Sequence, residues 1–137
     1  MTLEAPGWAL ELLRAARVGR LATTGEDGQP HLVPVCFVFD GDALYTPIDG
    51  KPKTTRRLKR VRNLETNPRA ALLVDHYEED WRRLRYVLVE GEGSLVEGAE
   101  VARVLASLRE KYPQYAEVEV GPEVIRIAPL RIAAWTA

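Results

Sequence analysis

Short apolar runs separated by turn-forming residues recur along this chain, and this pattern predicts several strands. The first strand is predicted at 18–24, and the turn-forming residues 25–30 separate it from a second strand at 31–40. A turn at 40–42 leads to a third strand at 43–48. Because these connections are too short for a parallel crossover, we expect the three strands to form an antiparallel meander.

The rest of the chain is predicted to add helices as well as strands. The predicted helices cover 6–16, 55–66 and 97–111, and the further strands cover 69–76, 85–96 and 123–136. Gly91 and Gly93 suit the bend of a small barrel, and Pro129 predicts a kink in the last strand. About six strands with helices inserted between them predict an α+β, barrel-like fold. The length of the chain suits one domain, at 1–137.

The second predicted strand is apolar on both of its faces. Val33, Val35, Phe37 and Phe39 share one face, and Leu32, Pro34, Cys36 and Val38 share the other. One face is expected to line the core, and the other must meet a helix, a partner subunit or a flat ligand. Pro34 cannot donate a ladder hydrogen bond, which predicts a strand edge or a bulge there.

The overall composition is that of an ordinary soluble domain. The 137 residues are 46% hydrophobic and 28% charged, and the formal net charge is −1. This balance gives no global attraction to nucleic acid or to an anionic membrane, so neither is an expected partner. A single cysteine, the lack of a signal-like N-terminus and the lack of a long apolar run predict a cytoplasmic protein.

Residues 51–62 concentrate positive charge. The bases in this segment, with no acid among them, are Lys51, Lys53, Arg56, Arg57, Lys59, Arg60 and Arg62. One interpretation is a solvated helix face. The helix that contains these bases is expected to be capped by Thr54 or Thr55. However, cations at the start of a helix are disfavoured unless an anion binds there. Arg57 falls one turn before the apolar stripe that begins at Leu58, so an inward guanidinium would also need an anionic partner. We therefore predict an anion site.

Other candidate chemistry is sparse. The chain has no glycine-rich phosphate loop, and His31, His76 and Cys36 are too widely spaced to predict a metal site. The two histidines are expected at strand ends, and Cys36 is expected to pack in the core rather than act as a nucleophile. Trp81, in a charged connection, is expected either to plug the barrel end or to stack on a ligand or a second subunit.

Three segments resemble a known family. Two of these segments resemble the pyridoxamine 5′-phosphate oxidase-like flavin and deazaflavin reductases. They are residues 29–37 (QPHLVPVCF) and the DGKPK motif at 49–53 together with the later Leu58. Residues 73–84 (LVDHYEEDWRRL) look like the F420-dependent subgroup of that family. The likeness covers about residues 8–135 and rests on the order and spacing of these motifs.

The resemblance implies a six-stranded antiparallel split β-barrel with flanking helices, the FMN-binding split barrel of the PNP oxidase-like proteins. It further implies a homodimer with two cofactors at the subunit interface. The cofactor-binding residues that it implies are Lys51, Lys53 and Arg57 for the phosphate, backbone groups of Val33, Pro34, Val35, Thr46, Pro47 and Ile48 around the ring, and Trp81 and Arg85 from the other subunit. His31 and Tyr45 are candidates for substrate contact. Arg85-Tyr86 stands where the family often has another aromatic residue.

The function expected from this resemblance is that of an oxidoreductase that passes a hydride from reduced F420 to a small organic acceptor. Because the deazaflavin itself carries the hydride, no indispensable acid or base is expected on the protein. Two alternatives remain open. One is an FMN-binding oxidase or simple flavoprotein, and the other is a non-enzymatic cofactor carrier or sensor.

Overall fold

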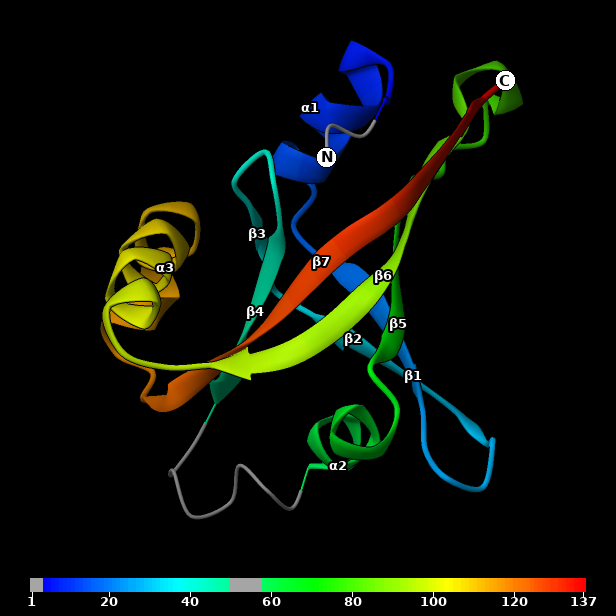
Figure 1. Cartoon of the computed structure of the whole chain (residues 1–137). Coiled ribbons are helices and arrows are strands. Elements are labelled where there is room, and N and C mark those ends of the chain that lie inside the picture. The colour runs from blue at the N-terminus through cyan, green and yellow to red at the C-terminus, as the bar shows by residue number, and fades with distance from the viewer. Residues whose placement is uncertain (1–3, 50–57) are drawn as a thin grey trace.

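The computed structural model describes residues 4–49 and 58–137, which form one curved antiparallel sheet with three α-helices packed around it (Figure 1). The strands are β1 (Gly19–Thr24), β2 (Pro30–Val35), β3 (Val38–Phe39), β4 (Leu44–Asp49), β5 (Arg69–His76), β6 (Arg85–Val96) and β7 (Val120–Thr136). The helices are α1 (Gly7–Ala15), α2 (Lys59–Thr66) and α3 (Ala99–Lys111), with short 3₁₀ turns η2 (Trp81–Arg83) and η3 (Pro113–Ala116). The expected α+β class is confirmed.

The sheet differs from the predicted barrel in strand number and in closure. Its seven strands run in the order β2-β1-β5-β6-β7-β4-β3. Within the described residues, the edge strands β2 and β3 do not pair with each other, so the barrel is open rather than closed. The prediction of six strands is therefore wrong, because the second predicted strand is two strands.

That second strand breaks between Val35 and Val38, where the chain passes from one sheet edge to the other. At the break, the backbone of Phe37 bonds to side chains instead of to a neighbouring strand. Its N–H donates to the Tyr112 hydroxyl over 3.2 Å, and its carbonyl accepts from the Lys111 ammonium over 2.9 Å. These bonds satisfy buried polar groups that a sheet ladder would otherwise satisfy.

The helix predicted to begin near Thr55 begins at Lys59. Leu58 precedes it with an extended backbone (φ −64°, ψ 134°), so a continuous helix from 55 is wrong. The predicted caps, Thr54 and Thr55, lie outside the described residues. The inward direction expected for Arg57 also no longer follows, because it assumed that helical spacing continued through Leu58.

The two faces of the second predicted strand have different surroundings. On one face, Val35, Phe37 and Phe39 enter the main core, as predicted. On the other face, Cys36 and Val38 pack beneath α3 in a second cluster. The expected packing role of Cys36 is thus confirmed. This face continues into β2, where Leu32 and Pro34 are exposed.

The long antiparallel pair of β6 and β7 bends at Gly91, where the strand register shifts between Glu90 and Gly91. Gly91 pairs with Pro129, as the predicted bend and kink require. In Figure 1, α1 lies near the C-terminal end of β7, α2 lies at the opposite end of the sheet, and α3 lies along one side. Among the described residues, no helix has the length and apolar character that crossing a membrane would require.

Candidate functional site

A broad groove crosses the outer face of four adjacent strands, β2, β1, β5 and β6. It has a volume of about 700 Å³. The residues that line it are Arg20, Ala22, Leu32, Ala71, Leu73, Asp75, Tyr86 and Leu88. Most of these side chains are apolar, and Leu32 is 67% exposed, so the groove is an uncovered apolar surface.

The groove exists because these strands are apolar on both faces. Leu21 and Leu72 point into the main core, while their neighbours Ala22 and Ala71 face the groove. The small alanines pair directly across β1 and β5 and leave the middle of this face hollow. This contribution of β1, β5 and β6 was not predicted from the sequence, although the apolar run at 70–74 carries the same two-sided signal as the second strand.

Polar and aromatic pairs border the groove. The Arg20 guanidinium lies 3.2 Å from the Asp75 carboxylate, and both side chains are partly exposed. At the far end, the rings of Tyr86 and Trp135 stack with their centroids 5.9 Å apart. The surface therefore combines an apolar floor with a charged pair and an aromatic pair, a composition typical of binding surfaces.

The predicted ring-lining residues of β2 lie beside this groove. Val33 is half-buried, Pro34 is exposed and Val35 is buried. Within the described residues, β2 is an edge strand, so one side of its backbone is open to a ligand. An open backbone edge beside an apolar hollow suits a flat heterocycle with hydrogen-bonding groups on its rim.

His31, a predicted substrate contact, is half-buried on β2. Its Nδ1 atom is buried and has no hydrogen-bond partner among the described residues. An unsatisfied buried polar atom is costly unless something outside the single chain bonds to it. The position is thus compatible with a ligand, and the substrate role stays a prediction.

The residues predicted on β4 are all buried. Thr46 and Pro47 pair with β7, and the Thr46 hydroxyl donates to the carbonyl of Cys36 over 2.8 Å. β3 is so short that it pairs only with Leu44 and Tyr45 of β4. The backbone edge of Thr46, Pro47 and Ile48 that faces away from β7 is therefore not paired with any described strand. Backbone contact with a ring, as predicted, is therefore still possible there, whereas side-chain contact is not.

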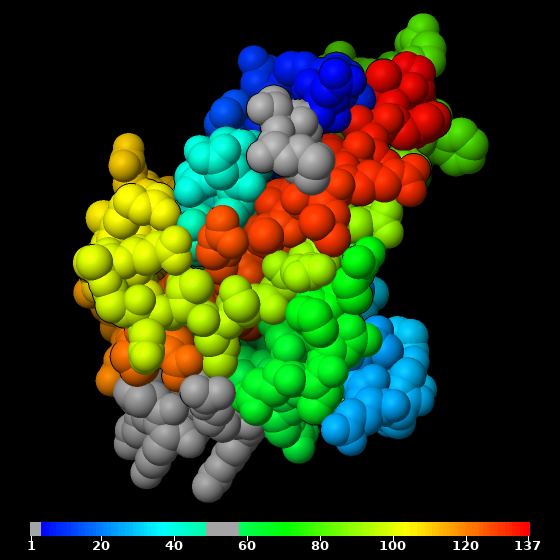
Figure 2. Space-filling model, in the orientation of Figure 1, coloured from blue at the N-terminus to red at the C-terminus, as the bar shows by residue number. Residues whose placement is uncertain are grey.

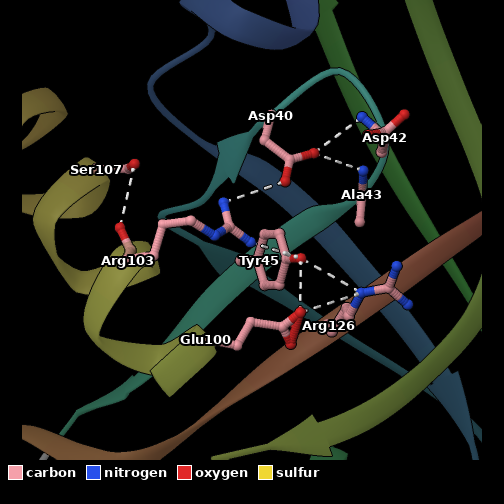
Figure 3. Close-up of polar contacts among 8 residues, drawn as sticks. All are labelled: Asp40, Asp42, Ala43, Tyr45, Glu100, Arg103, Ser107 and Arg126. Carbon is pink, nitrogen blue, oxygen red and sulfur yellow. Dashed lines mark hydrogen bonds and ion pairs between the residues drawn. The ribbon is translucent and has the colours of Figure 1, made fainter. Parts of the chain in front are cut away.

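Tyr45 does not face the groove. Its ring is 3% exposed and belongs to the core cluster beneath α3 (Figure 3). The hydroxyl donates to Glu100 over 3.3 Å and accepts from Arg103 over 3.2 Å and from Arg126 over 3.3 Å. Because this hydroxyl is fully engaged in holding α3 against β4 and β7, Tyr45 is a structural residue here, and the prediction of substrate contact finds no support.

The predicted phosphate site, Lys51, Lys53 and Arg57, lies outside the described residues. The described end of the same basic segment borders a cavity of about 380 Å³ between α2 and the β1–β2 hairpin. Lys59 and Arg62 line this cavity from α2, and the hairpin contributes acidic residues. Figure 2 shows the tip of this hairpin standing out from the surface beside α2.

The residues predicted to reach the partner's cofactor lie at the other end of the sheet. Trp81, in η2, is 66% exposed, so the interpretation of it as a plug is wrong and the stacking alternative stays open. The Arg85 guanidinium lies 5.9 Å from the centroid of the Trp8 ring. Arg85 also borders a cavity of about 270 Å³ with His76 and Arg83, so this end presents several cations.

No group of three or more histidine, cysteine, aspartate or glutamate side chains in the described ranges is close enough to hold a metal ion. The apolar groove and the open edge of β2 fit a flat organic cofactor, and the described cations near α2 and η2 fit an anionic tail. The residues present are therefore compatible with a flavin or a deazaflavin.

Comparison with known proteins identifies the family of this chain. The model of the pyridoxamine 5′-phosphate oxidase family matches residues 8–136. The 5a,11a-dehydrotetracycline/5a,11a-dehydrooxytetracycline reductase of Streptomyces rimosus is 35% identical over 124 residues, which cover 90% of this chain and 77% of that protein.

Solved structures share the fold over nearly the whole chain. The conserved hypothetical protein Rv2991 from Mycobacterium tuberculosis superposes with a TM-score of 0.78 at 26% identity, over 98% of this chain and 87% of that one. An F420 reductase superposes with a TM-score of 0.69 at 23% identity, over 94% of this chain and 98% of that one, which shows a common fold. From the family match and the reductase relative, the chain belongs to the pyridoxamine 5′-phosphate oxidase family.

Proposed function

We propose that this protein is a reductase that transfers a hydride from reduced F420 to a small organic acceptor. The observation that carries the proposal is the 35% identity to a reductase over 90% of the chain. The F420 reductase of the same fold and the seven bases of residues 51–62 favour F420 as the cofactor. A long anionic tail would need such a cluster of cations.

The bound deazaflavin would supply the hydride. The residues of this chain would then bind and orient the two reactants and exclude water. The open edge of β2 at Val33–Val35 would bond to the rim of the ring, and the buried Thr46–Ile48 would set the position of the neighbouring backbone. Lys51, Lys53 and Arg57 would hold the phosphate.

A homodimer is the second part of the proposal. The groove on β1, β2, β5 and β6 is a large apolar surface that no described element covers, and Leu32 is its most exposed apolar side chain. Burying such a surface against a second copy is favourable at roughly 25 cal/mol per Å² of apolar area before the costs of association. In such a dimer, Trp81 and Arg85 of each subunit would approach the cofactor bound to the other.

The alternative cofactor is FMN, which the family match supports as well. Titration of the cofactor-free protein with F420 and with FMN, followed by fluorescence quenching, distinguishes the two. We expect tighter binding of F420, and tighter binding of FMN would overturn this choice. The same titration with a Trp81→Leu variant tests whether Trp81 contributes to the quenching.

The reductase activity is tested separately with chemically reduced F420 and a panel of enones and quinones that includes 5a,11a-dehydrotetracycline. Re-oxidation of the cofactor, followed by the return of its visible absorbance, is expected with at least one acceptor and not in the absence of protein. Tight F420 binding without turnover across the panel would instead support a cofactor carrier or sensor.

A further inference from the structure

Three polar side chains lie in a row across one end of the sheet. His76 of β5 pairs directly with Arg85 of β6, and Arg85 pairs directly with Thr136 of β7. Directly opposed residues of antiparallel strands project to the same face. Their sequence neighbours Asp75 and Tyr86 line the groove, so the row projects to the opposite face of the sheet. The row therefore belongs to a surface that the groove does not include.

This row and Arg83 of η2 line a cavity of about 270 Å³. Its volume lies just below the roughly 300–1,000 Å³ that is typical of pockets for drug-sized ligands. The cavity therefore has room for a small organic molecule, whereas a flavin with its side chain is too large for it. Three of the described residues that line it, His76, Arg83 and Arg85, carry basic side chains.

Glu78 neutralises part of this positive charge but leaves Arg85 without an acidic partner. The Glu78 carboxylate accepts a hydrogen bond from His76, and its Oε1 atom lies 3.1 Å from Nε of Arg83. By contrast, Arg85 forms neither an ion pair nor a side-chain hydrogen bond with any residue that the structure describes, and its guanidinium lies against the Trp8 ring. The two guanidinium groups and the Glu78 carboxylate together leave an excess of one positive charge, even when His76 is neutral.

The donors beside this excess charge suit a carboxylate. Arg85 is half-buried, whereas His76 and Arg83 are exposed, so water screens the charge of Arg85 least. The planar guanidinium presents pairs of N–H donors that match the two oxygens of a carboxylate. Directly across from it, the Thr136 hydroxyl makes no hydrogen bond within the described part of the chain. A guanidinium and a hydroxyl thus lie side by side at one wall of the cavity.

We propose that this cavity binds a small monocarboxylate, and that Arg85 and Thr136 recognise its carboxylate group. Arg83 adds positive charge, and Glu78 holds the side chains of His76 and Arg83 at the wall of the cavity. The excess of a single positive charge favours a monoanion over a dianion such as phosphate. The ligand is separate from the cofactor, and the inference does not depend on the proposed function.

Benzoate and benzamide are suitable probes, because they have almost the same shape and differ in charge. Each is titrated into the isotope-labelled full chain without cofactor, and NMR follows the Nε–H signal of Arg85 and the backbone N–H signal of Thr136. The dissociation constant of benzoate should be at least about tenfold lower than that of benzamide, as one charge-assisted hydrogen bond would give. Equal affinities, or benzoate-induced changes confined to other residues, would overturn the proposal.

Two variants test the assigned donors. Arg85→Gln should raise the dissociation constant of benzoate at least about tenfold, and Thr136→Val should raise it by a smaller factor. Arg82→Gln is the matched control, because Arg82 lies in the same turn and pairs with Asp80 but does not line the cavity. An equal loss in Arg82→Gln, or unchanged affinity in both Arg85→Gln and Thr136→Val, would contradict the proposal. Circular dichroism confirms that each variant is folded.

The anionic tail of a cofactor is another source of negative charge for this cavity. Titration of benzoate into the protein saturated with F420 distinguishes the two sources. Unchanged affinity for benzoate supports a separate small acid, whereas competition between benzoate and F420 would assign the cavity to the cofactor and overturn the proposal. Failure of F420 to bind would count against the proposed function and leave the result with benzoate standing.

Discussion

A Cβ atom on Gly91 would lie 2.2 Å from the carbonyl oxygen of Ala128 on the neighbouring strand β7. The two backbones approach this closely where the register of β6 and β7 shifts. Since the close neighbour is backbone rather than a flexible side chain, it cannot move aside without distorting the sheet. The bend that separates the two ends of the molecule therefore depends on the absence of a side chain at this position.

Gly91→Ala should consequently lower the free energy of unfolding by at least about 2 kcal/mol, the cost of forcing an extra carbon into packed structure. Urea denaturation measures the change. Gly7→Ala is the matched control, because a Cβ at Gly7 would meet nothing within 4 Å at the start of α1. A Gly91→Ala variant as stable as Gly7→Ala would show that the bulge is not as tight as described.

Leu32→Glu should dissociate the proposed homodimer and leave the monomer folded. Leu32 is exposed in the single chain, so a carboxylate there costs the monomer little, but burying it against a second copy is costly. The dimer dissociation constant should rise at least about tenfold, as measured by sedimentation equilibrium. Val118→Glu is the control, because Val118 is also exposed but lies outside the groove. If both variants remain dimeric, the interface lies elsewhere.

The combined change Lys53→Ala and Arg57→Ala should weaken F420 binding while the dimer stays intact. Each charge-assisted hydrogen bond to a phosphate contributes roughly 1.5–3 kcal/mol, so the dissociation constant should rise roughly 100-fold or more. Fluorescence titration measures it. Arg109→Ala removes an exposed cation from the last turn of α3 as a control for net charge. Unaltered affinity in the double variant would place the phosphate site elsewhere.

Stability should rise with pH between 8 and 10 because of Lys111. Its pKa is about 8 in the folded protein and 10.5 ordinarily, so in this range the unfolded chain binds more protons than the folded chain. The free energy of unfolding increases with pH whenever that is so. Above pH 10 the raised pKa of Tyr112 acts in the opposite direction, so the range stops there. The urea midpoint should rise in the native protein, and Lys111→Met should remove this rise. An equal rise in both would exclude Lys111 as its source.

Much of the local structure was predictable because it depends on short-range patterns. The strands at 69–76 and 85–96 begin and end where apolar runs and turn residues predict. The break within the second strand was not predictable in this way, because its residues stay apolar on both faces throughout. What interrupts the strand is the distant Tyr112 and Lys111, which bond to Phe37.

The candidate site was likewise predictable from the sequence only in part. The apolar second strand and the basic segment were visible in the sequence, and the likeness of both to a flavin-binding family is borne out by the family match. The groove was not visible, because it requires β1, β2, β5 and β6 to lie side by side. The environment of Tyr45 was not visible either, because Leu44 and Tyr45 are adjacent in sequence yet belong to different core clusters. Which face of a strand meets a helix and which stays open is decided by contacts between residues far apart in the chain.

The sequence by itself determined where most of the strands and helices lie, which of their positions are apolar and which family the chain resembles, because these follow from residue order and spacing. Only the tertiary structure decided that Leu32 is exposed in a groove, that Tyr45 is enclosed by Arg103 and Arg126, and that Lys111 lies between two rings. The physical reason is that exposure and electrostatic surroundings depend on neighbours brought together by folding.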